Sequence, residues 1–347
     1  MSVYPNNYSY RKKLTFNNNI AETFINHPTP IFVTSTTPLD FSKVSSSTGL
    51  DVIFTDADGT TNLSFERVGW VDASNIAEFA VKVPTTTASV GTDIYMYYGN
   101  AAATDTSSAF NAFGTTSYGL VFHGDKPNTT WLESSGNGLT LNQTGAGITE
   151  VTGVLGKAAN IPGSTGNSIQ SADNTAVDTA NFTIEWLGKS ADFGSGRRRV
   201  YNQQAGGSYV IAGYNANLLE LGSSLDGILA TRGTDQSDNN WHHFALVRDT
   251  INDRARFYID GSQVGTEISV TNNSATAIAS QIMLFKYTEG DSEQPAGVFD
   301  EFLFHKVART DNWINWSKKL RLDQDRITFG SEETPGGVVF VPKVMFF

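Results

Sequence analysis

The chain has 347 residues, enough for two ordinary domains; 39% of them are hydrophobic and only 17% are charged. The formal net charge of −11 argues against nucleic acid as a partner, because a nucleic-acid-binding protein normally presents a basic face. The absence of cysteine excludes disulfides, thiolate catalysis and cysteine-based metal sites.

Residues 1–7 are polar and lead directly into a predicted strand. They contain no apolar segment of the kind that a signal peptide needs, so either processing has removed a leader or the protein is made and assembled in the cytoplasm. The initiating Met favours the second alternative. We also expect no membrane insertion, because no segment approaches the roughly 20 apolar residues that span a bilayer.

Short apolar runs separated by turn residues fill the first 116 residues. The clearest runs cover residues 12–16, 30–34, 51–54, 63–68, 78–83 and 93–98. Clusters of Asp, Gly, Pro, Thr and Asn separate them and predict turns. This pattern predicts an all-β domain.

Four segments of this first region carry a family resemblance. They are YRKKLT (10–15), GLDVIFTD (49–56), VKVP (81–84) and IYMYYGN (94–100). Together they resemble the DUF2341 type, a family of bacterial and viral β-sandwich domains of undefined function. The resemblance implies a β-sandwich over residues 1–116 that commonly sits beside lectin-like domains, and it implies no chemistry. Residues 101–116, rich in Ala, Ser and Thr, are expected to form a linker or a short helix.

Alternating apolar and polar residues mark the strands of the second region. In NFTIEW (181–186), alternation places Phe182, Ile184 and Trp186 on one face. The segments WHHFALVRD (241–249) and ARFYIDG (255–261) predict two strands joined by a turn. A second tight turn is predicted at Asp260-Gly261, because a type I′ turn needs positive φ at both central residues. The segment VFDEFLF (298–304) predicts a closing strand, and a short helix is expected around residues 310–318.

These segments, with the opening loop WLESSGNGL (131–139), resemble laminin-G-like, concanavalin A-like lectin domains in motif and order. The resemblance implies a jelly-roll sandwich over residues 117–333, which binds glycans or proteins more often than it catalyses. The expected fold class is therefore all-β: two tandem β-sandwiches, the C-terminal one a concanavalin A-like jelly roll. Residues 334–347 are expected to form an apolar docking tail.

The lectin resemblance also implies a calcium ion at the rim of the sandwich, and we expect no other cofactor. Glu133 and Asn137 in the opening loop would meet Asp300 on the closing strand, since Ca²⁺ prefers oxygen ligands. Glu133 stands where Asp is usual in the family, and its longer side chain can shift or remove the site. The alternative is that turn amides satisfy the Asp300 carboxylate and that Asn137 is a turn residue.

Glycan binding would use an aromatic platform with polar groups in exposed loops. Residues 213–217 read as an exposed loop tip with one aromatic residue, so Tyr214, Asn215 and Asn217 are candidates, joined by Tyr209. The alternative for each tyrosine is a place in the core. The basic run 197–199 is expected on a solvated hairpin or an edge strand.

Sequence signatures of enzymes are missing. The chain has no Gly-x-Ser-x-Gly nucleophile elbow, phosphate-binding loop or dinucleotide fingerprint. A glycosidase needs two carboxylates that face one bond, whereas the adjacent Asp300 and Glu301 are expected on opposite faces of a strand. His242 and His243 are likewise expected on opposite faces, one packed and the other exposed. We therefore expect no enzymatic activity.

The C-terminal tail follows a structure-breaking Pro-Gly-Gly and is strongly apolar. An exposed strand of this kind promotes aggregation unless something covers it. It either folds back on its own domain as a last strand or docks into a neighbouring subunit. The docking residues would be Val338, Val339, Phe340, Val341, Val344, Phe346 and Phe347.

Three functions remain open from the sequence. The favoured one is a non-enzymatic structural protein on a virion surface, a bacteriophage capsid decoration or a tail or fibre component, with a lectin-like domain for host attachment. Its partners would be other virion proteins, further copies of itself and a surface polysaccharide. The second is a bacterial cell-surface or secreted carbohydrate-binding adhesin. The third, a glycan-cleaving enzyme, would need a carboxylate pair.

Overall fold

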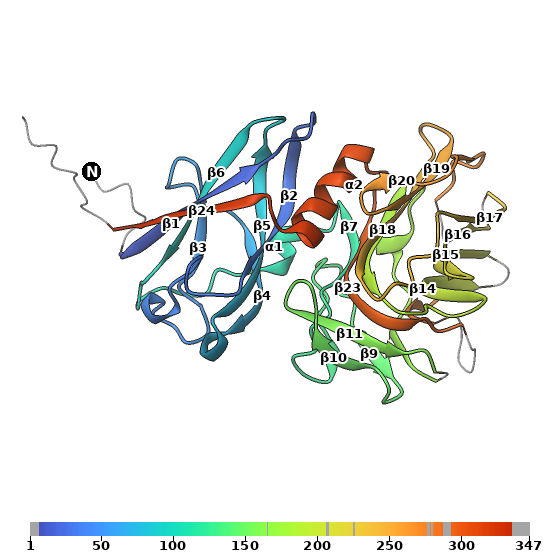
Figure 1. The fold of residues 1–347 in the computed structure, drawn as a ribbon, viewed down its shortest axis with the longest axis horizontal. Coiled ribbons are helices and arrows are strands. Elements are labelled where there is room, and N and C mark those ends of the chain that lie inside the picture. The colour runs from blue at the N-terminus through green and yellow to red at the C-terminus, as the bar shows by residue number, and fades with distance from the viewer. Residues whose placement is uncertain are drawn as a thin grey trace, which may run out of the picture.

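Two β-sandwiches lie side by side along the long axis of the molecule (Figure 1). The computed structural model describes residues 7–164, 166–205, 208–224, 226–275, 278, 280–286 and 293–334. Within these residues the chain is nearly all β, which confirms the predicted fold class. No helix in this part of the chain is long and apolar enough to cross a membrane.

The first sandwich consists of two small antiparallel sheets. Sheet I has the strand order β24 (Ile327–Glu333), β1 (Tyr10–Asn17), β6 (Gly91–Tyr98) and β3 (Ile53–Asp56). Sheet II has the order β2 (Phe24–Val33), β5 (Ile76–Thr86) and β4 (Phe65–Val71). Short helical turns η1 (Phe41–Lys43) and η2 (Asp72–Ser74) lie in the connections. Aromatic residues fill the core, where Phe54 packs edge-on against Phe79 with ring centroids 5.2 Å apart.

The second sandwich consists of two larger sheets, III and IV. Sheet III runs in the order β10 (Thr149–Thr152), β11 (Lys157–Pro162), β23 (Ala296–His305), β13 (Phe182–Lys189), β18 (Trp241–Asp249), β19 (Arg254–Ile259) and β20 (Ser262–Gln263), with β7 (Tyr118–Phe122) on β23 and β21 (Ile268–Ser269) on β19. Sheet IV runs in the order β17 (Ile228–Arg232), β16 (Leu218–Ser223), β15 (Ser208–Asn215), β14 (Arg197–Ala205), β22 (Ile282–Leu284), β12 (Ser168–Ser171), β9 (Leu141–Thr144) and β8 (Thr130–Trp131). A helical turn, η3 (Thr175–Val177), precedes β13.

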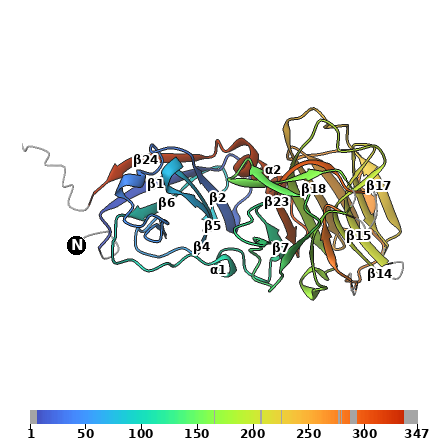
Figure 2. The same cartoon turned by 90° about the horizontal axis from the view of Figure 1, so that it is seen from below.

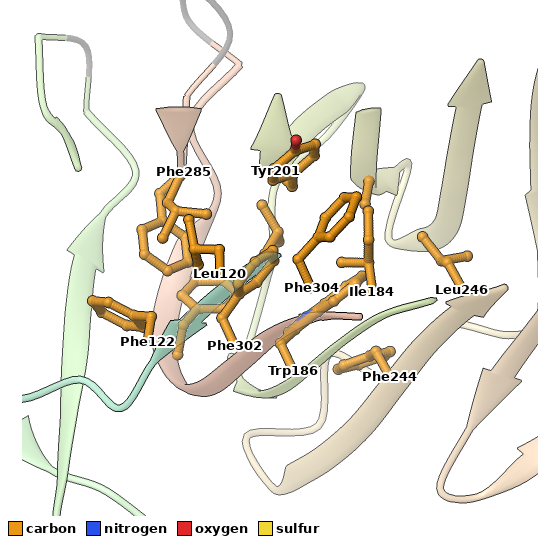
Figure 3. Packing of buried hydrophobic residues seen from close by; sticks show 14 of the residues in the cluster. Leu120, Phe122, Ile184, Trp186, Tyr201, Phe244, Leu246, Phe285, Phe302 and Phe304 are labelled. Carbon is orange, nitrogen blue, oxygen red and sulfur yellow. The ribbon is translucent and has the colours of Figure 1, made fainter. Parts of the chain in front are cut away.

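The core of the second sandwich lies between sheets III and IV, and Figure 3 shows part of it. Phe182, Ile184 and Trp186 of β13 are all buried there, as the alternation predicts. Antiparallel pairing places Trp186 opposite Phe244 of β18, and their rings stack with centroids 5.6 Å apart. The predicted turn at residues 260–261 also forms, with φ values of 50° and 76°.

A β-bulge in β23 turns two adjacent carboxylates toward the same side of sheet III. Phe299 and Phe302, three residues apart, both reach the core, and the pairing of β23 with β13 shifts register beside them. Glu301 has a positive φ of 49° at this point. Asp300 and Glu301 consequently both lie on the face away from the core. Their expected placement on opposite faces was wrong, because nothing in the alternation reveals the extra residue.

The two adjacent histidines of β18 have different surroundings. His243 is buried, and its Nε2 lies 2.9 Å from the Glu185 carboxylate. His242 lies at the rim between two carboxylates, 2.8 Å from Asp260 and 3.1 Å from Asp238. The expectation of one packed and one exposed side chain is met only in part, because just 11% of the His242 side chain is exposed.

Helix α2 (Asp311–Lys318) lies between the two sandwiches (Figures 1 and 2). Thr310 begins it as the N-cap, since its hydroxyl accepts a hydrogen bond from the Trp313 N–H at 3.0 Å. Trp316 stacks on Phe24 of the first sandwich with centroids 5.7 Å apart. The predicted helix is therefore present and forms part of the contact between the sandwiches. A second short helix, α1 (Ala109–Phe113), lies in the region expected to be a linker or a helix.

After α2 and the π-helical turn η4 (Lys319–Asp323), the chain returns to the first sandwich. There β24, red in Figure 1, pairs with β1, and Leu14 lies opposite Phe329. Arg11 forms an ion pair with Glu333 at 2.6 Å. This pairing differs from the expected division, in which residues 117–333 form one lectin-like domain. The seven predicted docking residues of the tail lie outside the described residues.

Candidate ligand-binding face

Tyr214 belongs to the core and not to an exposed loop. It lies on β15, fully buried, where its hydroxyl accepts a hydrogen bond from the Trp186 indole at 2.8 Å and its ring stacks on Phe193 with centroids 4.1 Å apart. Burial raises the pKa of Tyr214 well above its ordinary value. The predicted loop tip at 213–217 is corrected, because β15 continues to Asn215 and the turn begins only at Ala216.

On β15, the residues that alternate with the buried Tyr214 point to the outer face of sheet IV. Tyr209 and Ile211 lie there above Gly222 of the neighbouring strand. A Cβ atom at position 222 would be 2.5 Å from the Ile211 side chain and 3.1 Å from the Tyr209 ring, so glycine lets both side chains approach the main chain closely. Leu229 of β17 is 47% exposed beside them. A pocket of about 170 Å³ is lined by Arg197, Arg199, Gln204, Tyr209, Ile211 and Leu229.

An ion-pair network forms one wall of this pocket. The Glu220 carboxylate accepts hydrogen bonds from Arg197 Nε at 2.8 and 3.0 Å, and from Asn215 Nδ2 at 3.2 Å. Arg199 contacts the same carboxylate at 3.3 Å and donates to Glu293 at 2.7 Å. Glu220 is buried, whereas 31% of the Arg197 side chain is exposed. The network therefore holds the Arg197 guanidinium in place at the pocket, where its planar donors can meet ligand oxygens.

The predicted glycan-binding residues divide between this face and other places. Tyr209 lines the pocket, and Asn215 adjoins it through Glu220. Asn217 occupies the turn after β15 with φ 64°, and its amide donates to Asp235 at 3.1 Å.

Other residues of the pocket were missed by the sequence reasoning. The basic run 197–199, expected at a hairpin or an edge, begins β14, which lies inside sheet IV between β15 and β22. Arg197, Gln204 and Leu229 were not predicted as site residues. Strand alternation through 208–215 was the available signal, since it places Tyr209 outside and Tyr214 inside.

Two family models match the chain in the predicted order. A domain of unknown function, DUF2341, matches residues 48–131. The concanavalin A-like lectin/glucanases superfamily matches residues 163–315, which cover most of sheets III and IV. The second sandwich has the concanavalin A-like fold of this superfamily, and we call it the lectin domain for its fold alone. The pocket on the outer face of sheet IV thus belongs to this domain.

Solved structures that are similar to part of this chain include binding domains of toxins. The receptor-binding domain of botulinum neurotoxin mosaic serotype C/D is 13% identical, with a TM-score of 0.48 over 59% of this chain and 51% of that chain. The binding domain of Paraclostridial Mosquitocidal Protein 1 is 16% identical, with a TM-score of 0.48 over 59% and 52%. The chain thus spans about half the length of these toxin domains.

A further similar structure is domain 4 of an extracellular arabinanase from Geobacillus stearothermophilus, in complex with arabinotriose. It is 19% identical, with a TM-score of 0.46 over 59% of this chain and 98% of that chain. No curated protein matches the chain.

The three predicted calcium ligands of the lectin domain each have hydrogen bonds to different main-chain groups. Glu133 accepts hydrogen bonds from the main-chain N–H groups of Val121 and Ser135 at 3.0 and 2.8 Å. Asn137 donates through its amide to the Tyr118 carbonyl at 2.8 Å. Both side chains thus form hydrogen bonds with nearby main-chain groups.

Asp300 likewise forms hydrogen bonds with the main chain. Its Oδ2 accepts hydrogen bonds from the N–H groups of Val154 and Leu155, at 2.8 and 3.2 Å. Asp300 Oδ1 has no hydrogen-bond partner among the described residues, so turn amides satisfy only one of the two carboxylate oxygens. The calcium site that the resemblance implies stays a prediction.

Proposed function

We propose that the protein is a non-catalytic carbohydrate-binding protein that holds a glycan on the outer face of sheet IV. The observation that carries this proposal is the Tyr209 ring next to Gly222, in one pocket with the exposed Leu229 and with Arg197. The match to a lectin superfamily over residues 163–315 supports a binding role for this domain.

The pocket suits a sugar for a physical reason. A sugar ring presents C–H groups on one face and hydroxyl groups at its edge, so it can rest on an aromatic ring while polar groups bind its rim. Tyr209 and Leu229 offer the apolar surface, whereas Arg197 and Gln204 offer hydrogen-bond donors. Because Glu220 already fixes Arg197, little side-chain entropy is lost when a ligand binds.

A pair of alanine variants tests this proposal. Glycan-array screening of the full chain selects a ligand, and titration calorimetry then compares Tyr209→Ala with Ile251→Ala. We expect Tyr209→Ala to weaken binding at least about tenfold, since a buried aromatic contact contributes about 1.5 kcal/mol or more. Ile251 is 81% exposed on a turn away from this pocket, so its variant should bind normally. Equal affinity of both variants and the wild type would place the ligand elsewhere.

We propose further that this lectin domain is displayed by a larger assembly, either a virion of a bacteriophage or a bacterial cell surface. The support is the apolar sequence of residues 338–347, which begins five residues after the end of β24 in the sequence. Light scattering of the full chain and of a chain ending at Glu333 tests the assembly. An oligomer that becomes a monomer on truncation supports docking by the tail, and two monomers contradict it.

A further inference from the structure

A second cluster of functional groups lies buried between the two sandwiches. Glu66 of β4 and Glu78 of β5 project from the first sandwich. His123, directly after β7, and Glu301 of β23 project from the lectin domain. All four are at least 95% buried. Residues on both sandwiches therefore meet here without access to water.

The charges in this cluster do not balance. Glu301 accepts a hydrogen bond from Arg321 Nε at 3.1 Å and contacts His123 Nδ1. Glu66 accepts one from the Ser134 hydroxyl at 2.6 Å, which is a neutral partner. The carboxyl groups of Glu66, Glu78 and Glu301 thus face one guanidinium and one imidazole. A buried charge without a counter-charge is costly, so a cation or protons must compensate.

Several ligand atoms in the cluster lack partners. His123 Nε2, Glu78 Oε2 and Glu66 Oε2 are buried and have no hydrogen-bond partner among the described residues. His123 Nε2 and Glu66 Oε2 are 3.7 Å apart, which is too far for a hydrogen bond. Buried polar atoms of native proteins are nearly always satisfied, so these atoms point to a missing partner.

Three side chains of the cluster lie close enough together to approach one ion. Glu78, His123 and Glu301 each offer a ligand atom within 4.8 Å of the others, and the Glu301 oxygens also meet His123 Nδ1 and Arg321 Nε. Tetrahedral ligands of one Zn²⁺ ion at bonds of about 2.0–2.1 Å lie about 3.4 Å apart, so the side chains must close by up to about 1.4 Å to share the ion.

Gly156 lies directly beside Glu78 and leaves no room there for a side chain of its own. A Cβ atom at Gly156 would be 2.1 Å from Glu78 Oε2. Gly156 also has a positive φ of 65°, so its position favours glycine for a second reason. No residue at this position can supply a counter-charge to Glu78.

We propose that Glu78, His123 and Glu301 bind a single Zn²⁺ ion that ties the two sandwiches together. Imidazole nitrogen and carboxylate oxygen are ligands that Zn²⁺ accepts, and a set containing imidazole disfavours Mg²⁺ and Ca²⁺. Binding displaces the protons that otherwise compensate the cluster. Because the ligands come from both sandwiches, the ion stabilises their mutual placement. This inference does not depend on glycan binding.

The experiment uses the untagged full chain, stripped of metal with EDTA and titrated with Zn²⁺. We expect uptake of one Zn²⁺ per chain by mass spectrometry of bound metal. We also expect the unfolding temperature to rise by about 5 °C at a hundredfold excess over the dissociation constant. Mg²⁺ and Ca²⁺ at the same concentration should produce neither effect.

The variant Glu78→Gln keeps the shape of the side chain and removes a charged ligand. It should lose the Zn²⁺ uptake and the temperature rise, yet unfold no earlier than the metal-free wild type, since it also removes a buried charge. His242→Gln is the matched control, because His242 lies between Asp238 and Asp260 at the rim and offers a histidine–carboxylate group away from the cluster. It should bind Zn²⁺ like the wild type.

Two results would overturn the proposal. One is a wild-type chain that takes up no Zn²⁺, which would mean that protons compensate the buried carboxylates. The other is uptake by Glu78→Gln equal to that of the wild type together with loss in His242→Gln, which would move the ion to the rim.

Discussion

Tyr214 and Tyr209 lie on the same strand and face opposite sides of it. The hydroxyl of Tyr214 is the acceptor for the buried Trp186 indole, whereas Tyr209 lines the outer pocket. We expect Tyr214→Phe to lower the free energy of unfolding by about 1–3 kcal/mol, because the Trp186 N–H is left buried without an acceptor. Urea denaturation measures this change, with Tyr209→Phe as the control that should unfold like the wild type. A neutral Tyr214→Phe would contradict the buried hydrogen bond.

Single residues show what the sequence could and could not reveal. The places of Phe182, Ile184 and Trp186 in the core followed from alternation alone, since a strand has only two faces. Tyr214 was misplaced because the end of β15 gives no local sign of where its turn begins. The same strand rule, applied from residue 208, would have separated Tyr214 from Tyr209.

Strand β24 completes a sheet of the first sandwich, although the sequence places it after the second sandwich. It covers one edge of β1, and Phe329 packs against the core of that sandwich. We expect a chain ending at Arg326 to expose the β1 edge and to aggregate, because an uncovered strand edge pairs with other chains. Light scattering and limited proteolysis compare it with a chain ending at Thr334. Equal behaviour of both chains would mean that β24 contributes little.

The existence of strands was predictable, but their long-range partners were not. The β18–β19 pair and its following turn are local in sequence, so the turn residues were enough to predict them. The pairing of β24 with β1 joins segments from opposite ends of the chain. The bulge at Glu301 inserts one residue into β23, and no change in the residue types of the strand marks it. Such features depend on tertiary packing. The interface cluster could not be foreseen either, because its members come from four separate strands or turns.

Contact between the two sandwiches makes the whole molecule sensitive to acid. His27 of the first sandwich and His305 of the lectin domain both lie against Trp313 of α2, with ring centroids 4.5 and 6.2 Å away. Burial lowers the pKa of His27 well below its ordinary value, and burial also lowers the pKa of His305 to about 4. The groups that face His305 are Glu185, which it contacts, and Arg309, which donates to its Nδ1 at 3.1 Å. Both histidines are therefore neutral in the folded protein at neutral pH.

The sign of the pH dependence follows from this neutrality. An unfolded histidine titrates near pH 6.5, so between pH 6.5 and about 4 the unfolded chain binds more protons than the folded one. The stabilisation is complete above pH 6.5 and is lost as the pH falls toward 4. For His305 alone the difference of about 2.5 pKa units corresponds to about 3 kcal/mol. We expect urea denaturation to give a falling free energy of unfolding across this window.

The variant His305→Gln separates this histidine from the carboxylates that also titrate in acid. It should reduce the slope of the unfolding free energy against pH between 6.5 and 4.5. The reduction should be close to the slope that one additional proton bound by the unfolded chain produces, whatever the effect on absolute stability. His242→Gln is the control, because the hydrogen bond with Asp260 raises the pKa of His242. The stabilisation by that histidine is complete below pH 6.5 and is lost only as the pH rises above this value, so its removal should leave the slope between 6.5 and 4.5 nearly unchanged. An unchanged slope in His305→Gln would mean that this imidazole titrates normally and that the interface admits water.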